Sequence, residues 1–171
     1  MSDPEELPEH HRNQLSRIRD HLPENDLEFM VLKGHLLVEE LLISIIDKML
    51  FDSGELKGAR LTFFQRLCLV RSFLPKSAGA FQHAVELVEK LNQLRNAMSH
   101  SLEPLAFEKR VQEFNSLAES NLPIMAHSNG QTDERRLRLV IIAICAILKK
   151  VAHEKIDGLR TEGFFKLPLA T

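Results

Sequence analysis

Apolar residues recur along this chain at intervals of three and four, the spacing of amphipathic helices, and no convincing alternating strand pattern interrupts them. Glycine and proline divide the pattern into helical blocks. We therefore predict an all-α fold, a single-domain helical bundle of about six helices that spans residues 1–171. The expected helices cover residues 5–21, 24–51, 61–74, 77–100, 105–119 and about 132–155.

Two of these helices carry apolar residues around most of their circumference. The second, with Asn25 or Asp26 as its N-cap, is expected to be central in the bundle. The last, capped by Thr132 or Asp133, is expected in the core or in a subunit interface. Its longest apolar run, 139–148, is about half of what a membrane span requires, so no membrane association is expected.

Composition narrows the class of protein. With 171 residues, 44% of them hydrophobic and 27% charged, the chain is typical of one soluble globular domain. The net charge of −2 gives no overall basic field, so a nucleic-acid role would depend on a local patch. The acidic, polar N-terminus excludes a signal peptide, and we expect a cytoplasmic protein. Cys68 and Cys145 lie in apolar helical patterns and are expected to be buried, reduced thiols.

One His/Glu pair in the sequence could be part of a metal site. The stretch HLLVEE places His35 and Glu39 one turn apart on a helix, as in half of a metal site or in an ordinary structural pair. Helical di-metal sites repeat Glu-x-x-His on several helices, and no second copy occurs in this sequence. We therefore expect no metal and no cofactor.

The stretch LRNAMSHSL (94–102) differs from the His/Glu pair because it contains arginine, asparagine and histidine close together. At about 100° per residue, Asn96 and His100 share a helix face, whereas Arg95 lies nearer the core stripe and nearly opposite His100. A straight helix therefore cannot direct Arg95 and His100 to one point through their backbone positions. Either the long arginine side chain reaches round, or a second copy of the helix supplies the partner, as in a symmetric dimer.

A cleft with these side chains suits RNA chemistry. A histidine can take the proton of a ribose 2′-hydroxyl or give one to the leaving 5′-oxygen. Arginine can bind the scissile phosphate, and Asn96 can orient the imidazole or the phosphate. An alternative stays open on spacing alone: Arg95 pairs with Glu39 or Glu40, and His100 is a cation near a helix C-terminus.

The segment RNAMSH (95–100) resembles the R-x4-H motif of the HEPN superfamily, the higher eukaryote and prokaryote nucleotide-binding domains. KGHLLVEELLISII and LTFFQRLCLV are similar to the two helices before the motif helix, so the resemblance covers about residues 27–102. It implies a HEPN-like bundle of four to six helices, with a motif-bearing core at about 26–120, that dimerises with the two motifs at the interface. Many members are metal-independent endoribonucleases in toxin–antitoxin, phage-defence or CRISPR systems, and others are RNA-binding or regulatory scaffolds without catalysis.

Carried over residue by residue, the resemblance assigns phosphate binding to Arg95, orientation to Asn96 and acid/base work to His100. Glu39, Glu40 and Ser99 are candidate supporting residues. We therefore expect a cytoplasmic, homodimeric endoribonuclease of the toxin or defence type, with RNA as substrate and an antitoxin or regulatory protein as partner. The alternative is a catalytically inactive HEPN-fold regulatory or interaction protein, similar to mannitol-operon repressors. Leu102 stands where toxins silenced by nucleotidylation tend to carry tyrosine, so that form of silencing is not expected.

Overall fold

The computed structural model describes residues 16, 18–50, 54–56, 58–73, 79–98, 104–125 and 130–161. These residues form α-helices and contain no strand, which confirms the predicted all-α bundle. The helices are α2 (Leu27–Met49), α3 (Phe63–Phe73), α4 (Gly79–Met98), α5 (Pro104–Asn121) and α6 (Asp133–Thr161), with short 3-10 turns η2 (Gly54–Leu56) and η3 (Pro123–Met125). Of the expected first helix, 18–21 are helical, and most of the remainder lies outside the described residues.

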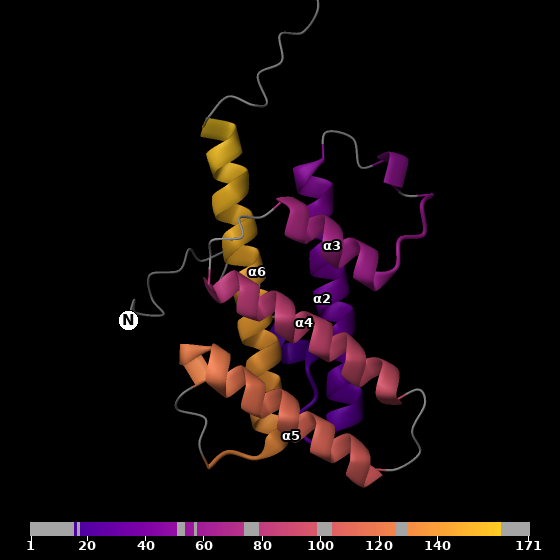
Figure 1. Ribbon diagram of the computed structural model, residues 1–171, viewed down its shortest axis with the longest axis vertical. Helices are drawn as coiled ribbons and strands as arrows, with labels where there is room; N and C mark the ends of the chain where they lie inside the picture. Colours follow the sequence, from indigo (N-terminus) through magenta and orange to yellow (C-terminus); the bar gives the residue numbers. More distant parts are fainter. Residues whose placement is uncertain are drawn as a thin grey trace, which may run out of the picture.

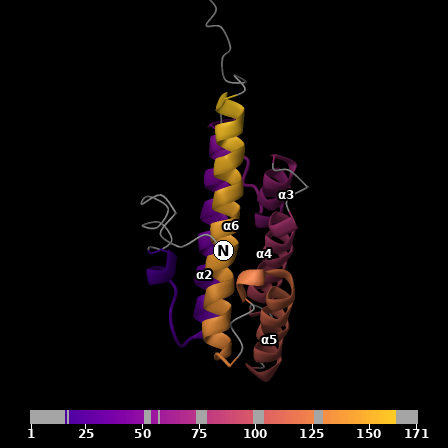
Figure 2. The same ribbon diagram turned by 90° about the vertical axis from the view of Figure 1, so that its left-hand side faces the viewer.

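The helices form two layers. α2 and α6 run side by side in the same direction, and the antiparallel pair α4 and α5 crosses them obliquely (Figure 1). In the perpendicular view, α3, α4 and α5 all lie on one side of the α2–α6 layer (Figure 2). α2 contacts α3, α4 and α6, so the expectation that it is central is confirmed.

Side chains at the helix starts explain where these helices begin. Asp26 is the N-cap of α2, and its Oδ1 accepts a hydrogen bond from the Phe29 N–H at 2.8 Å. Before α3, Thr62 and Gln65 form a capping box: the Gln65 N–H donates to Thr62 Oγ1, and the Thr62 N–H donates to Gln65 Oε1. Thr132 caps α6 by accepting from the Arg135 N–H. The two predicted caps, at Asp26 and Thr132, are confirmed.

One glycine allows the two long helices to approach closely. A Cβ placed on Gly34 of α2 would lie 2.5 Å from Cδ1 of Ile141 on α6, which is fully buried. The absence of a side chain at this position therefore fixes the distance between α2 and α6. The core that they share with the other helices includes the largest fully buried side chains: Met30, Leu42, Ile45, Leu67, Phe81, Leu87, Leu91, Leu122, Leu137, Ile141, Ile144 and Leu148.

The apolar circumference of α2 is only partly buried. Four of its large apolar side chains remain 38–45% exposed: Phe29, Leu32, Leu36 and Ile43. We call these four residues the outer face of α2. α2 is therefore central and still presents an apolar surface to solvent. No helix in the described part of the chain has both the length and the apolar character to cross a membrane.

Candidate active site

The predicted motif begins in the last turn of α4. Arg95 and Asn96 are both exposed there, and Arg95 Nη1 donates a hydrogen bond to Asn96 Oδ1 at 3.3 Å. Because Asn96 Oδ1 accepts this bond, its amide N–H groups remain the donors that can face a bound group. Ser99 and His100, the other predicted residues of the motif, lie outside the described residues.

The two supporting acids lie on α2 and differ in their surroundings. Glu40 is exposed, whereas the side chain of Glu39 is 26% exposed and accepts a short hydrogen bond from Nη1 of Arg66 on α3. Glu39 therefore forms an ion pair with Arg66, a partner that the sequence alternative, which paired Arg95 with Glu39 or Glu40, did not include. The sequence held no signal for this pair, since 27 residues separate the two side chains.

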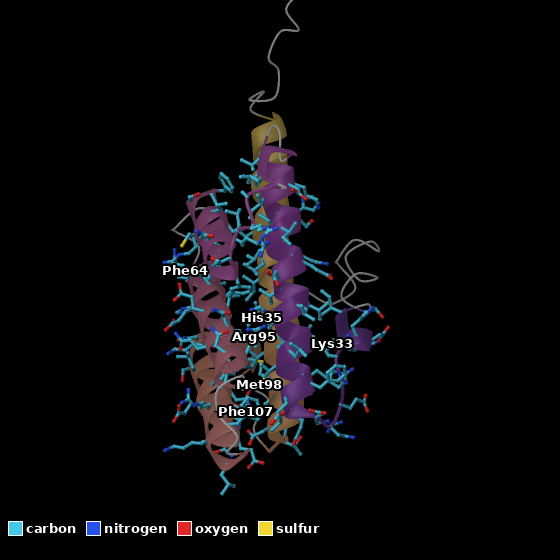
Figure 3. All side chains as sticks on the ribbon, turned by 90° about the vertical axis from the view of Figure 1, so that its right-hand side faces the viewer. Lys33, His35, Phe64, Arg95, Met98 and Phe107 are labelled. Carbon is cyan, nitrogen blue, oxygen red and sulfur yellow. The ribbon has the colours of Figure 1, made fainter. Side chains whose placement is uncertain are left out.

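His35 on α2, a histidine outside the predicted motif, lies beside these residues (Figure 3). We call Arg95, His35, Asn92, Glu39 and Arg66 the Arg95 cluster. His35 is 7% exposed, its Nε2 lies 3.1 Å from Asn92 Oδ1 on α4, and its ring stacks on Phe63 with 4.2 Å between ring centroids. With Asn92 Oδ1 as acceptor, the imidazole carries its proton on Nε2. The helical spacing of His35 and Glu39 was visible in the sequence, but Asn92 and Phe63 come from two other helices.

The charge of Arg95 reaches this buried histidine. Figure 3 shows His35 and Arg95 next to each other at the junction of α2 and α4. Burial lowers the pKa of His35 below its ordinary value, and the positive charge of Arg95 acts in the same direction. The hydrogen bond with Asn92 and the charge of Glu39 oppose this shift. Burial and the charge of Arg95 thus both disfavour a positive charge on His35.

This arrangement favours an anionic ligand at the exposed end of the junction. The carboxylate of Glu39, on the same helix as His35, forms its ion pair with Arg66. The guanidinium of arginine is a planar set of N–H donors that matches the oxygens of a phosphate. Arg95 and Asn96 together can therefore bind and orient a phosphate group at the surface.

The remaining cysteines and acids do not assemble into a second site. Cys68 is exposed on α3, so the expectation that it is buried is wrong. Cys145 is buried on α6 as expected, and burial raises the pKa of its thiol to about 12. Among the described residues, no three His, Cys, Asp or Glu side chains are grouped closely enough to hold a metal ion.

No protein-family model, no curated protein and no solved structure matches this chain.

Proposed function

We propose that this chain is a metal-independent endoribonuclease of the HEPN type that acts through a composite site of Arg95, Asn96 and His100 in a dimer. The observation that carries the proposal is the position of Arg95, exposed in the last turn of α4 and hydrogen-bonded to Asn96. Such a pair can hold the scissile phosphate while a histidine works on the neighbouring ribose. We further propose that the nuclease acts in the cytoplasm as a toxin or defence protein and is controlled by an antitoxin or regulatory protein.

The reaction needs no group beyond these side chains and the RNA. His100 accepts the proton of the ribose 2′-hydroxyl, and the 2′-oxygen forms a bond to phosphorus. The bond from phosphorus to the 5′-oxygen breaks, and this oxygen takes a proton from the imidazolium of His100 or from that of the second copy. Arg95 stabilises the negative charge that develops on the phosphate oxygens. The products are a 2′,3′-cyclic phosphate and a 5′-hydroxyl, so DNA, which lacks the 2′-hydroxyl, is not cut.

The buried cluster supports this role of Arg95. Arg66 forms an ion pair with Glu39, and burial disfavours a positive charge on His35 beside Arg95. Asn92 hydrogen-bonds to His35 one turn before Asn96, which fixes the rotation of α4 about its own axis. Arg95 is thereby presented at a defined place beside α2.

Cleavage of single-stranded RNA in the presence of EDTA tests the proposal. We expect His100→Ala and Arg95→Ala to lower the rate at least about a hundredfold while circular dichroism and the unfolding midpoint stay unchanged. Arg110→Ala, which removes an exposed arginine on α5, is the matched control and should cut at the parent rate. A 2′,3′-cyclic phosphate at the new 3′ end identifies the mechanism. Full activity in His100→Ala would contradict it.

A second function, a non-catalytic regulatory or interaction protein with the same fold, is favoured by one observation. The exposed apolar outer face of α2 suits the binding of a protein, and a net charge of −2 gives little general attraction for RNA. Overexpression separates the two functions. Growth arrest that is lost in His100→Ala supports the nuclease, whereas equal growth with parent and variant, together with no cleavage in vitro, supports the interaction protein.

A further inference from the structure

The outer face of α2 gathers four large apolar side chains on one side of the helix: Phe29, Leu32 and Leu36 at successive turns, and Ile43 two turns further on, beyond Glu39 and Glu40. Phe29, Leu32, Leu36 and Ile43 lie within about 60° of one another round the helix and extend over about four turns. The other exposed large apolar side chains among the described residues occur one to a helix, on α3, α5 and α6. Several large apolar side chains exposed on one side of a helix indicate an interaction site.

The outer face lies directly beside the candidate active site. On α2, His35 borders one flank and Lys33 the other, and Figure 3 shows these two labelled side chains on opposite sides of the helix. Leu36 is about 100° from His35 and about 60° from Lys33, so it points outward between them. Arg95 lies on the His35 flank. A partner seated on the outer face would therefore also cover one side of the Arg95 cluster.

We propose that the partner is a second copy of this chain, with the two α2 helices packed antiparallel and the two-fold axis passing beside Leu36. The proposal rests on the proposed function in one respect, since the composite site needs two copies of the motif. It adds the surface and the register through which those copies meet.

The register follows from the spacing of the apolar residues. Phe29 and Ile43 each lie seven residues from Leu36, on opposite sides of it along the helix. An antiparallel pair centred on Leu36 therefore places Phe29 of one copy against Ile43 of the other, twice, with the two Leu36 side chains meeting at the axis. The contacts of Leu36 with Leu36 and of Phe29 with Ile43 are then apolar on apolar, and Leu32 of one copy lies opposite Glu39 of the other.

The charges on one flank agree with the same register. Lys33 lies three residues before Leu36 and Glu40 four residues after it, about 60° and 40° round the helix on the same side. A two-fold axis that relates antiparallel helices places each flank against the same flank of the other copy. Lys33 of one copy therefore faces Glu40 of the other, and the symmetry repeats this pair of opposite charges.

The two-fold symmetry also determines which residues meet on the His35 flank. Because like flanks meet in the antiparallel arrangement, the two His35 flanks, each with its Arg95, face each other near the axis. A parallel arrangement would place the two Arg95 side chains on opposite sides of the helix pair. Only the antiparallel packing supplies two arginines, and with them two copies of the motif, to one cleft.

The molar mass in solution, measured by light scattering, tests the surface. We expect the parent to have the mass of two chains, and Leu36→Glu to have the 19.6 kDa of one chain, with the self-association Kd raised about tenfold or more. Leu139→Glu is the matched control, because Leu139 is 40% exposed against 44% for Leu36. It lies about 200° round α6 from Ile141, which faces α2, so its substitution should leave the dimer intact.

Disulfide crosslinking tests the position of the axis independently of mass. In a Cys68→Ser background, which removes the exposed native thiol, Leu36→Cys should form an intermolecular disulfide on mild oxidation, and Leu139→Cys should not. For the flank, Lys33→Glu should weaken the dimer, and Lys33→Glu combined with Glu40→Lys should restore it. Restoration would not occur if the helices packed in parallel.

The outcomes separate this inference from the proposed function. A dimer that depends on Leu36 but cuts no RNA supports the surface and rejects the nuclease. RNA cleavage supports the nuclease. If the molar mass is unchanged in Leu36→Glu and Leu36→Cys forms no intermolecular disulfide, the proposed dimer surface is overturned. A monomeric parent also overturns the surface, and a variant ending at Thr161 would then show whether residues 162–171 of the same chain cover the outer face instead.

Discussion

His35 of α2 and Asn92 of α4 meet across the layer boundary, with 3.1 Å between Nε2 of the imidazole and Oδ1 of the amide. The histidine ring is also stacked on Phe63 of α3, so one side chain joins three helices. Asn92 is one helical turn before Asn96, and the contact therefore sets how the end of α4 is presented beside α2. Two further contacts between helices, Gly34 with Ile141 and Asn115 with Asp133, also hold the bundle together.

Acid should destabilise the fold through His35. Burial lowers the pKa of His35 in the folded protein, whereas in the unfolded chain it titrates near its ordinary value of about 6.5. The unfolded chain therefore binds the proton more readily, so the contribution of His35 is complete above about pH 6.5 and is lost as the pH falls through the window between the two pKa values. The free energy of unfolding, measured with urea at pH 7.5 and 5.5, should decrease at the lower pH.

The variant His35→Gln isolates this effect. Glutamine can still hydrogen-bond to Asn92 but takes up no proton, so its loss of stability between pH 7.5 and 5.5 should be smaller than that of the parent. At pH 7.5 the variant should be less stable by about 1–2 kcal/mol, because the stacked ring is lost. His153→Gln, at an exposed position on α6, should keep the pH dependence of the parent. Equal pH dependence in parent and His35→Gln would rule out this role.

The contact between α2 and α6 should not tolerate a methyl group at Gly34. The added Cβ would lie 2.5 Å from Ile141 Cδ1 and 3.0 Å from Cγ1, inside a fully buried region. Gly34→Ala should therefore destabilise the protein by about 1–3 kcal/mol in urea unfolding, although alanine is the better helix former. In an Ile141→Val background, which removes Cδ1, the same substitution should cost at least about 1 kcal/mol less. Additive effects of the two changes would show that the helices move apart instead.

Asn115 on α5 should contribute substantially to the stability of the fold. It is fully buried, and its Nδ2 donates to the backbone oxygen of Asp133 at 3.2 Å and to its Oδ1 at 3.3 Å, at the start of α6. Asn115→Ala removes both bonds and leaves a small cavity, so a loss of about 2–3 kcal/mol is expected from thermal or urea unfolding. Asn121→Ala, which removes a long hydrogen bond to Glu86 at the surface, should cost less than about 0.5 kcal/mol.

The sequence by itself determined the helices and where most of them begin. Asp26 and Thr132 are cap residues followed by apolar residues at helical spacing, and both signals act within a few residues of chain. The all-α class follows in the same way, because helical hydrogen bonds join residues only four apart. The prediction that Arg95 and Asn96 lie near the end of a helix also depended on signals within a few residues of chain. In the structure both residues lie in the last turn of α4.

Tertiary structure decided what each helix face meets. His35 and Glu39 share a flank in the sequence pattern, yet their partners, Asn92 and Arg66, come from other helices and could not be chosen from spacing. The apolar pattern of α2 likewise did not reveal that Leu36 and its neighbours stay exposed, nor the pattern of α3 that Cys68 does. Helical periodicity records which side chains are apolar, whereas burial depends on which other helix covers them, and only the packing of the whole chain fixes that.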